Sequence, residues 1–189
     1  MSVRPAVFLD RDGTLNIATI RDGRSYPPAS LAELAIVPGA APALSALRAA
    51  GFCTVVVTNQ PDVALGKQRR EVVEAINDAL RAQLPLDDIR VCYHADADGC
   101  DCRKPKPGML LDAARAWNIA LDASFMVGDR WRDVAAGQAA GCRTLLIEAG
   151  YRERRIEPTF SVTSLVEACD IILKTAGGPR RGLGYEERQ

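Results

Sequence analysis

Short apolar runs alternate along the chain with longer segments rich in Ala, Leu and Arg. The apolar runs contain many β-branched residues and have the length of buried strands, whereas the intervening segments have the length of helices. The expected strands are residues 6–9, 54–57, 89–92, 125–127 and 144–147, and the expected helices are residues 42–50, 70–84, 109–117 and 133–140. Gly51 and Gly141 follow two of these helices, where C-terminal caps are expected.

This alternation of strands and helices favours a parallel sheet covered by helices on both faces. We therefore predict an α/β fold of the Rossmann-like, doubly wound type. The chain of 189 residues is long enough for one full hydrophobic core, so we expect a single domain over residues 1–176, without a large cap domain. Residues 177–189 combine several glycines with charges and are predicted to form a flexible tail.

Polar clusters follow the first four expected strands. They comprise residues 10–12, 58–60, 92–104 and 128–129. Ligands of open α/β sheets bind outside the carboxyl ends of the strands, so these four loops are expected to converge at one edge of the sheet. Residues 17–30 form a longer loop beside the first cluster, and two interpretations stay open for it: one wall of a substrate pocket, or a plain surface connection.

The first cluster places Asp10 and Asp12 two residues apart at the end of a strand. From there, both carboxylates can be aimed at one phosphoryl group. Taken alone, Asp-x-Asp-Gly also fits a solvated turn or a calcium loop. An EF-hand loop that begins at Asp10 needs Gly at its sixth position and Glu at its twelfth, where this chain has Leu15 and Arg21. The EF-hand is therefore excluded, and the solvated turn has to be weighed against the rest of the chain.

Four segments of the chain follow the expected strands in a fixed order. They are Asp-Arg-Asp-Gly-Thr at 10–14, Val-Thr-Asn-Gln at 57–60, Arg-Lys-Pro-Lys-Pro-Gly at 103–108 and Val-Gly-Asp-Arg-Trp-Arg-Asp at 127–133. In this order they resemble the four motifs of the haloacid dehalogenase superfamily of phosphatases. The resemblance covers residues 6 to 148 and implies that the chain is an enzyme, a phosphoric monoester hydrolase.

The resemblance also implies roles for single residues. Asp10 matches the nucleophile, whose carboxylate attacks phosphorus to form an aspartyl-phosphate. Asp12 matches the general acid, which protonates the leaving oxygen and then acts as the base for the hydrolytic water. Thr58, Asn59 and Lys104 match the groups that bind the phosphoryl oxygens through a hydroxyl, a backbone N–H and a point charge, respectively.

Magnesium is the cofactor that the resemblance implies. A phosphate dianion would be repelled by the acidic cluster unless a cation lay within it, and hard oxygen ligands suit Mg²⁺. In the family, the residues that match Asp10 and Asp129, with the backbone carbonyl of the residue that matches Asp12, hold this ion. Asp133 either orients the metal and its waters or is simply an acid in the first turn of a helix. The single histidine, His94, lies in another cluster, so a histidine base is not expected.

Three of the six cysteines crowd into one short segment together with His94. Three thiolates and one imidazole complete a tetrahedral zinc site with no position left open for water. The expected ligands are Cys92, His94, Cys100 and Cys102. Reduced thiols without metal are the alternative. We expect a structural zinc, since the loop 92–102 leads directly into Lys104 and would hold it in place. The remaining cysteines, Cys53, Cys142 and Cys169, are expected to be small core residues.

The cysteine loop immediately before Arg-Lys-Pro is similar to that of the capless, zinc-containing branch of the superfamily. This branch includes phosphatases of D-glycero-D-manno-heptose 1,7-bisphosphate, which release the 7-phosphate, and of histidinol phosphate. The first substrate is our leading expectation and the second the alternative. In the heptose enzymes, the residues that match Arg103, Lys104 and Arg130 contact the substrate. The heptose enzymes usually have an arginine where this chain has Leu65, and a lysine where this chain has Arg130. Because of both differences, the identity of the leaving group stays open.

Composition narrows the choice of partners. Lys and Arg together number 24, as do Asp and Glu, so no overall field favours nucleic acid or an anionic membrane. No apolar run has the length of a membrane span or of a signal-peptide core, and we expect a cytoplasmic monomer. A nucleic-acid 3′-phosphatase would need a basic stripe or binding module. A non-catalytic, zinc-stabilised binding module would have no reason to combine Asp10, Asp12, Lys104 and Asp129.

Overall fold

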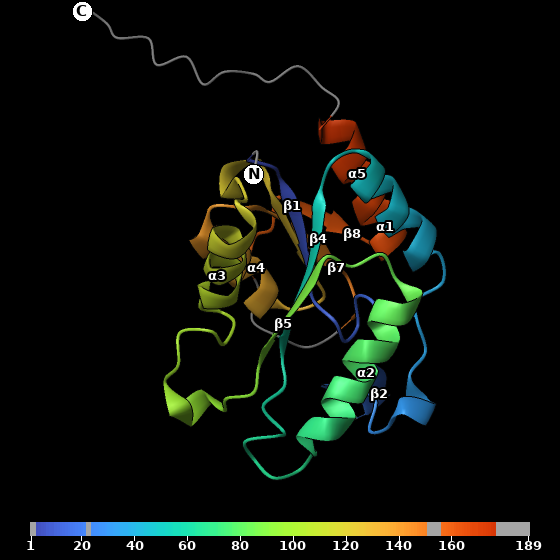
Figure 1. Cartoon of the computed structure of the whole chain (residues 1–189), viewed down its shortest axis with the longest axis vertical. Coiled ribbons are helices and arrows are strands. Elements are labelled where there is room, and N and C mark those ends of the chain that lie inside the picture. Colours follow the sequence, from blue (N-terminus) through green and yellow to red (C-terminus); the bar gives the residue numbers. More distant parts are fainter. Residues whose placement is uncertain (1–2, 22–23, 151–155, 177–189) are drawn as a thin grey trace, which may run out of the picture.

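A six-stranded, fully parallel sheet forms the centre of the molecule (Figure 1), with strand order β5-β4-β1-β6-β7-β8. The computed structural model describes residues 3–21, 24–150 and 156–176. The strands are β1 Ala6–Leu9, β4 Cys53–Asn59, β5 Asp88–Cys92, β6 Phe125–Gly128, β7 Arg143–Ile147 and β8 Phe160–Val162. Strand β1 lies between β4 and β6, with Phe8 paired with Val55 on one side and Met126 on the other.

Helices cover both faces of this sheet (Figure 1). They are α1 Ala40–Ala49, α2 Arg70–Gln83, α3 Gly108–Trp117, α4 Trp131–Ala140 and α5 Leu165–Ala176. Strand β1 is buried along its whole length and shows why two layers are needed. Val7 and Leu9 belong to the core cluster that contains residues of α1, α2 and α5, whereas Ala6 and Phe8 belong to the cluster with α3 and α4. The side chains of successive residues point to opposite faces of a strand, so an unbroken apolar strand requires a helical layer on each side.

The predicted α/β fold with a doubly wound parallel sheet is confirmed. Most elements lie within two residues of the expected bounds, and β4 extends through Asn59, so that the polar cluster at 58–59 forms the end of this strand. Gly141 has φ 84° at the C-cap of α4, as expected of a left-handed helix terminus. Within the described residues, the sheet and its two helical layers form one domain. The predicted flexible tail, residues 177–189, lies outside the described residues.

Two parts of the fold were not predicted. One is the C-terminal pair β8 and α5, although the buried residues of α5 at 165, 168, 169 and 172 have helical spacing. The other is a short antiparallel hairpin within the 17–30 segment, formed by β2 Thr19–Arg21 and β3 Arg24–Tyr26. Three-residue strands contain too few residues to show alternation in the sequence, because they span only one and a half periods of the pattern.

The described part of the chain also contains three short 3-10 turns, η1 Leu31–Glu33, η2 Asp96–Asp98 and η3 Leu121–Ala123. The second lies in the long connection from β5 to α3, which carries the cysteine cluster. None of the described helices combines the length and the apolar character that crossing a bilayer requires.

Candidate active site

A cavity of about 380 Å³ opens where the polar loops meet at the carboxyl edge of the sheet. Its walls come from the segments that follow β1, β4, β5 and β6 and from the 17–30 segment. The lining residues are Asp10, Asp12, Tyr26, Pro27, Asn59, Gln60, Pro61, Asp62, Arg103, Lys104, Arg130, Trp131, Arg132 and Asp133. Of the two interpretations of the 17–30 segment, this lining favours the pocket wall, because Tyr26 and Pro27 belong to it.

Lys104 joins two acidic residues at the base of the site. Its side chain is 2% exposed, and Nζ donates to Asp10 Oδ1 at 2.8 Å and to Asp133 Oδ1 at 2.5 Å. Burial opposes the charge of Lys104, but the two carboxylates outweigh it and raise the pKa of the ammonium above its ordinary value. Burial also raises the pKa of Asp10 to about 6, although Lys104 acts in the opposite direction. The lysine is therefore a permanent positive charge beside the expected nucleophile.

Asp10, Asp129 and Asp133 form a compact group of buried carboxylates. One oxygen from each lies within 4.8 Å of the other two. The approach of Asp133 depends on Gly128, because a Cβ at this position would lie 2.3 Å from Asp133 Cγ. Carboxylates this close repel one another unless a cation neutralises them, and Lys104 supplies one positive charge for three acids. The donor set, hard oxygens only, fits Mg²⁺.

Asp12 is held in one orientation by three side chains. Arg11 Nη2 donates to Asp12 Oδ2 at 3.0 Å, Gln60 Nε2 donates to the same oxygen at 2.7 Å, and Asn16 Nδ2 donates to Oδ1 at 3.1 Å. Arg11 is completely buried and also donates from Nη1 to Asn77 Oδ1 on α2 at 2.9 Å. The carboxylate of Asp12 is thus fixed to the core, while it still borders the cavity.

Thr58 and Asn59 lie at the end of β4 but contact different parts of the site. The Asn59 side chain accepts a hydrogen bond from the backbone N–H of Lys104 at 3.1 Å and donates to its carbonyl at 3.0 Å, which fixes the loop that carries the lysine. Thr58 is 1% exposed, and its Oγ accepts a hydrogen bond from Gln60 Nε2 at 2.9 Å. Thr58 is not among the residues that line the cavity, so the structure places its hydroxyl behind Gln60.

Three arginines, Arg103, Arg130 and Arg132, line the same cavity as the carboxylates. Arg103 precedes Lys104, and the other two lie at the start of α4. Asp96 of η2 accepts hydrogen bonds from Arg103 Nε at 2.7 Å and Arg132 Nη1 at 2.9 Å. These bonds lower the pKa of Asp96 to about 2. The cavity therefore combines an acidic base with a guanidinium-rich wall, which suits a substrate with more than one anionic group.

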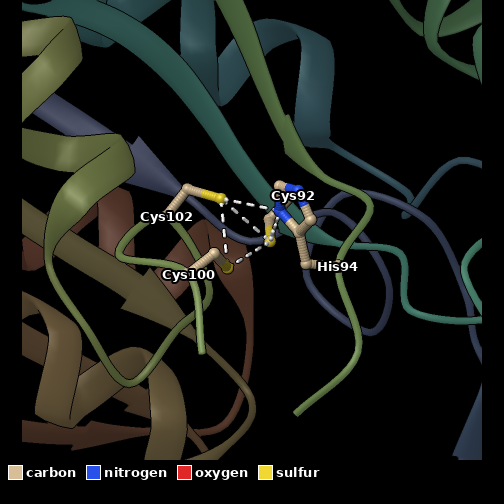
Figure 2. A group of neighbouring side chains, drawn as sticks. All are labelled: Cys92, His94, Cys100 and Cys102. Carbon is tan, nitrogen blue, oxygen red and sulfur yellow. Dashed lines mark hydrogen bonds between the residues drawn. The ribbon is translucent and has the colours of Figure 1, made fainter. Parts of the chain in front are cut away.

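The side chains of Cys92, His94, Cys100 and Cys102 point toward one another (Figure 2). The Sγ atom of Cys102 lies 3.1 Å from Cys92 Sγ and 3.4 Å from Cys100 Sγ, and the Sγ atoms of Cys92 and Cys100 lie 3.7 Å apart. His94 Nδ1 lies 3.3 Å from Cys102 Sγ and 3.7 Å from Cys92 Sγ. A tetrahedron with Zn–S bonds of about 2.3 Å has edges of about 3.8 Å, so the four ligand atoms are spaced nearly as a zinc site requires.

Comparison with known proteins shows the family to which the chain belongs. The chain is 36% identical over 165 residues to D-glycero-beta-D-manno-heptose-1,7-bisphosphate 7-phosphatase of Pseudomonas putida, a match that covers 85% of this chain and 91% of the relative. The enzyme of the same name from Pasteurella multocida is 39% identical, with 78% and 84% covered. A family model described as HAD-hydrolase-like matches residues 101–168. The chain belongs to the haloacid dehalogenase-like hydrolases.

A solved structure of this family extends the likeness to three dimensions. It is the D,D-heptose 1,7-bisphosphate phosphatase from B. bronchiseptica, complexed with magnesium and phosphate. The two structures superpose with a TM-score of 0.77 and 32% sequence identity, and the match covers 90% of this chain and 99% of the other. The predicted class, a haloacid dehalogenase-like phosphoric monoester hydrolase, is confirmed.

Within this hydrolase, the structure brings together most of the predicted site residues at one cavity: Asp10, Asp12, Asn59, Arg103, Lys104 and Arg130. Asp129 lies among the carboxylates beneath it, and the four expected zinc ligands form a separate cluster. Arg132 and Asp96 were not among the predicted site residues. A signal for Arg132 was present in its position, because it lies two residues after Arg130 at the start of a helix whose N-terminus was expected at the site.

Proposed function

We propose that this hydrolase is a Mg²⁺-dependent sugar phosphatase that releases the 7-phosphate of D-glycero-D-manno-heptose 1,7-bisphosphate. The observation that carries the proposal is the buried group in which Lys104 joins Asp10 and Asp133 beneath an arginine-lined cavity. The names of the relatives at 36% and 39% identity support the same substrate.

The reaction proceeds in two steps on the residues of the chain. A carboxylate oxygen of Asp10 attacks phosphorus, the bond from phosphorus to the sugar oxygen breaks, and Asp12 gives its proton to that oxygen. Asp12 then takes a proton from a water molecule, which attacks phosphorus and releases inorganic phosphate from Asp10. Lys104 stays protonated throughout and stabilises the negative charge of the phosphoryl oxygens. Asn59 keeps Lys104 in place through both hydrogen bonds to its backbone.

Two metals belong to this proposal. Asp10, Asp129 and the backbone carbonyl of Asp12 would hold Mg²⁺, with Asp133 orienting the group through its contact with Lys104. When bound, Mg²⁺ neutralises the charge that builds up between the phosphoryl group and the carboxylates. The cluster of three cysteines and His94 would hold a structural zinc ion, because its four ligand positions are all supplied by the protein.

The arginines favour the bisphosphate over the alternative substrate. Histidinol phosphate carries one phosphate and a cationic amino group, so it offers the three arginines of the cavity no second anionic group to bind. A heptose bisphosphate carries a second phosphate, and the planar fork of an arginine suits bidentate contacts to it. Arg103 and Arg130, with the newly found Arg132, are therefore assigned to the part of the substrate that does not react.

A phosphate-release screen tests the substrate. With Mg²⁺ present, we expect the highest kcat/KM for heptose 1,7-bisphosphate among a panel that includes histidinol phosphate and a DNA 3′-phosphate. Failure to release phosphate from both heptose 1,7-bisphosphate and histidinol phosphate would refute the substrate assignment and leave the enzyme class intact.

The nucleophile is tested with Asp10→Asn. This variant should lower kcat by about 10⁴-fold or more, because removal of a nucleophile eliminates the covalent route. Asp78→Asn is the matched control, since Asp78 lies on α2 with its side chain 73% exposed and does not line the cavity. Retained turnover in Asp10→Asn would refute the assignment of the nucleophile.

A further inference from the structure

Asp96 occupies an unusual position between the cysteine cluster and the cavity. It lies on η2, in the five-residue segment that separates His94 from Cys100. The segment is shaped locally, because Asp98 Oδ2 accepts a hydrogen bond from the backbone N–H of Ala95 at 2.8 Å. Asp96 does not line the cavity itself, but both of its partners do.

One carboxylate oxygen of Asp96 serves two guanidinium groups. Oδ1 accepts from Arg103 Nε at 2.7 Å and from Arg132 Nη1 at 2.9 Å, and Arg132 Nη1 also lies 3.4 Å from the carbonyl oxygen of Lys104. The two arginines lie 29 positions apart in the sequence. Their common contact with Asp96 holds the two guanidinium groups next to each other.

The orientation of Arg103 determines which of its donors faces a ligand. Its side chain is only 13% exposed, and Nε is taken by Asp96. Nη1 is buried and has no hydrogen-bond partner among the described residues. A buried guanidinium donor without a partner costs free energy, and a bound anion would satisfy it.

We propose that Asp96 is a positioning residue that orients Arg103 and Arg132 toward the second anionic group of the substrate. The proposal rests on the proposed bisphosphatase function, which it deepens by naming the residue that prepares the binding of the non-reacting phosphate. The Asp96 side chain is 66% exposed, and an ion pair with so exposed a partner contributes little to stability, so the effect belongs to substrate binding and not to folding. Fixed guanidinium groups lose less conformational freedom when the substrate binds.

Kinetics on two substrates test the proposal. Asp96→Ala should raise KM for heptose 1,7-bisphosphate by about tenfold and leave kcat within about twofold, because the arginines bind a group that does not react. For p-nitrophenyl phosphate, which has no second anionic group, kcat/KM should stay at the wild-type value. A merely structural role of Asp96 would lower activity on both substrates. An unchanged or lower KM for the bisphosphate overturns the proposal.

Asp101→Ala is the matched control. Asp101 lies in the same loop, and its side chain is 94% exposed and pairs only with Lys106 among the described residues. Its removal takes away the same charge without touching either arginine, so KM should not change. In an Arg103→Ala/Arg132→Ala background, Asp96→Ala should have no further effect, because a positioning residue acts through its partners.

A spectroscopic measurement separates this proposal from the proposed function. The Nε–H signal of Arg103, assigned through Arg103→Lys, should shift in the nitrogen–proton spectrum of Asp96→Ala and stay in place in Asp101→Ala. If the wild-type protein does not hydrolyse the bisphosphate, the proposed function fails, and this signal then decides the positioning role alone. An Arg103 signal that is the same with and without Asp96 overturns it.

Discussion

At the scale of single residues, the site depends on a glycine, because the position of Asp133 leaves no room for a side chain at residue 128. Gly128 ends β6, and Asp133 lies directly against it, in the space that a Cβ would fill. This contact lets Asp133 reach Lys104 Nζ, which in turn reaches Asp10. From the sequence, Gly128 was only part of a motif, because the need for a glycine there arises from a contact with Asp133, five positions further along the chain.

Gly128→Ala should therefore impair catalysis as well as stability. The added methyl group displaces the Asp133 carboxylate, so we expect kcat to fall by about 10- to 100-fold through the displaced Lys104. Overpacking should also cost about 1–3 kcal/mol of unfolding free energy. Steady-state kinetics and urea unfolding measure the two effects.

Gly137→Ala is the control for this experiment. A Cβ at Gly137 would lie 2.6 Å from Met126 Cβ and 2.7 Å from Thr144 Cγ2, in the core between α4 and the sheet. A comparable loss of stability is expected, with kcat near the wild-type value under conditions where the protein is folded. If Gly128→Ala kept the wild-type kcat, the chain of contacts through Asp133 would not matter for turnover.

At the scale of elements, the cysteine loop is the part whose structure depends on a ligand. Two cysteines of the cluster, Cys100 and Cys102, are partly exposed, whereas Cys92 is buried like the three cysteines outside the cluster. Burial raises the pKa of Cys53 to about 11 and that of Cys142 and of Cys169 to about 12. A thiol reacts as its thiolate, so these three should be inert at neutral pH.

Metal removal should expose thiols in two stages. We expect about one zinc ion per chain by metal analysis, and zinc should protect the thiols of Cys92, Cys100 and Cys102. A chelator should make the partly exposed thiols of Cys100 and Cys102 reactive, and the four buried thiols, which include Cys92, should react only after unfolding. Cys100→Ser should lower the zinc content, and Cys169→Ala should not. A zinc-free native protein with the same thiol reactivity would contradict the metal site.

The predictability of most elements followed their length and packing; the exception is α5, whose 12 residues have buried positions at helical spacing but were not predicted. Strand β1 and helix α2 were predicted within one residue, because strong local patterns coincide with their buried faces. Strand β8 has three residues at the edge of the sheet, and the hairpin β2–β3 also has three-residue strands, so neither has enough positions to show a period. The link from Asp96 to Arg132 spans 36 residues, and no sequence pattern marks such a contact.

At the scale of the whole molecule, the charges balance overall but separate within the cavity. The formal net charge is zero, while the cavity has carboxylates at its base and three arginines on its wall. The cavity has a volume of about 380 Å³, and Arg103 and Lys104 within it are paired with the acids Asp96 and Asp10, respectively. This distribution suits a small phosphorylated molecule better than a nucleic-acid backbone, which requires an extended basic surface.

The protein should therefore bind duplex DNA weakly and without the steep salt dependence that phosphate contacts produce. Each DNA phosphate that the protein neutralises makes the slope of log K, the binding constant, against log salt concentration more negative by about 0.9. A nucleic-acid 3′-phosphatase with about six phosphate contacts would therefore lose about 10³-fold in affinity between 50 and 200 mM salt. Fluorescence anisotropy with a labelled duplex that ends in a 3′-phosphate measures the slope. Arg103→Ala is the matched variant, because it removes one charge from the cavity: it should raise KM for the bisphosphate and leave the anisotropy unchanged. A steep slope in the wild type, reduced in Arg103→Ala, would instead assign the cavity to nucleic-acid ends.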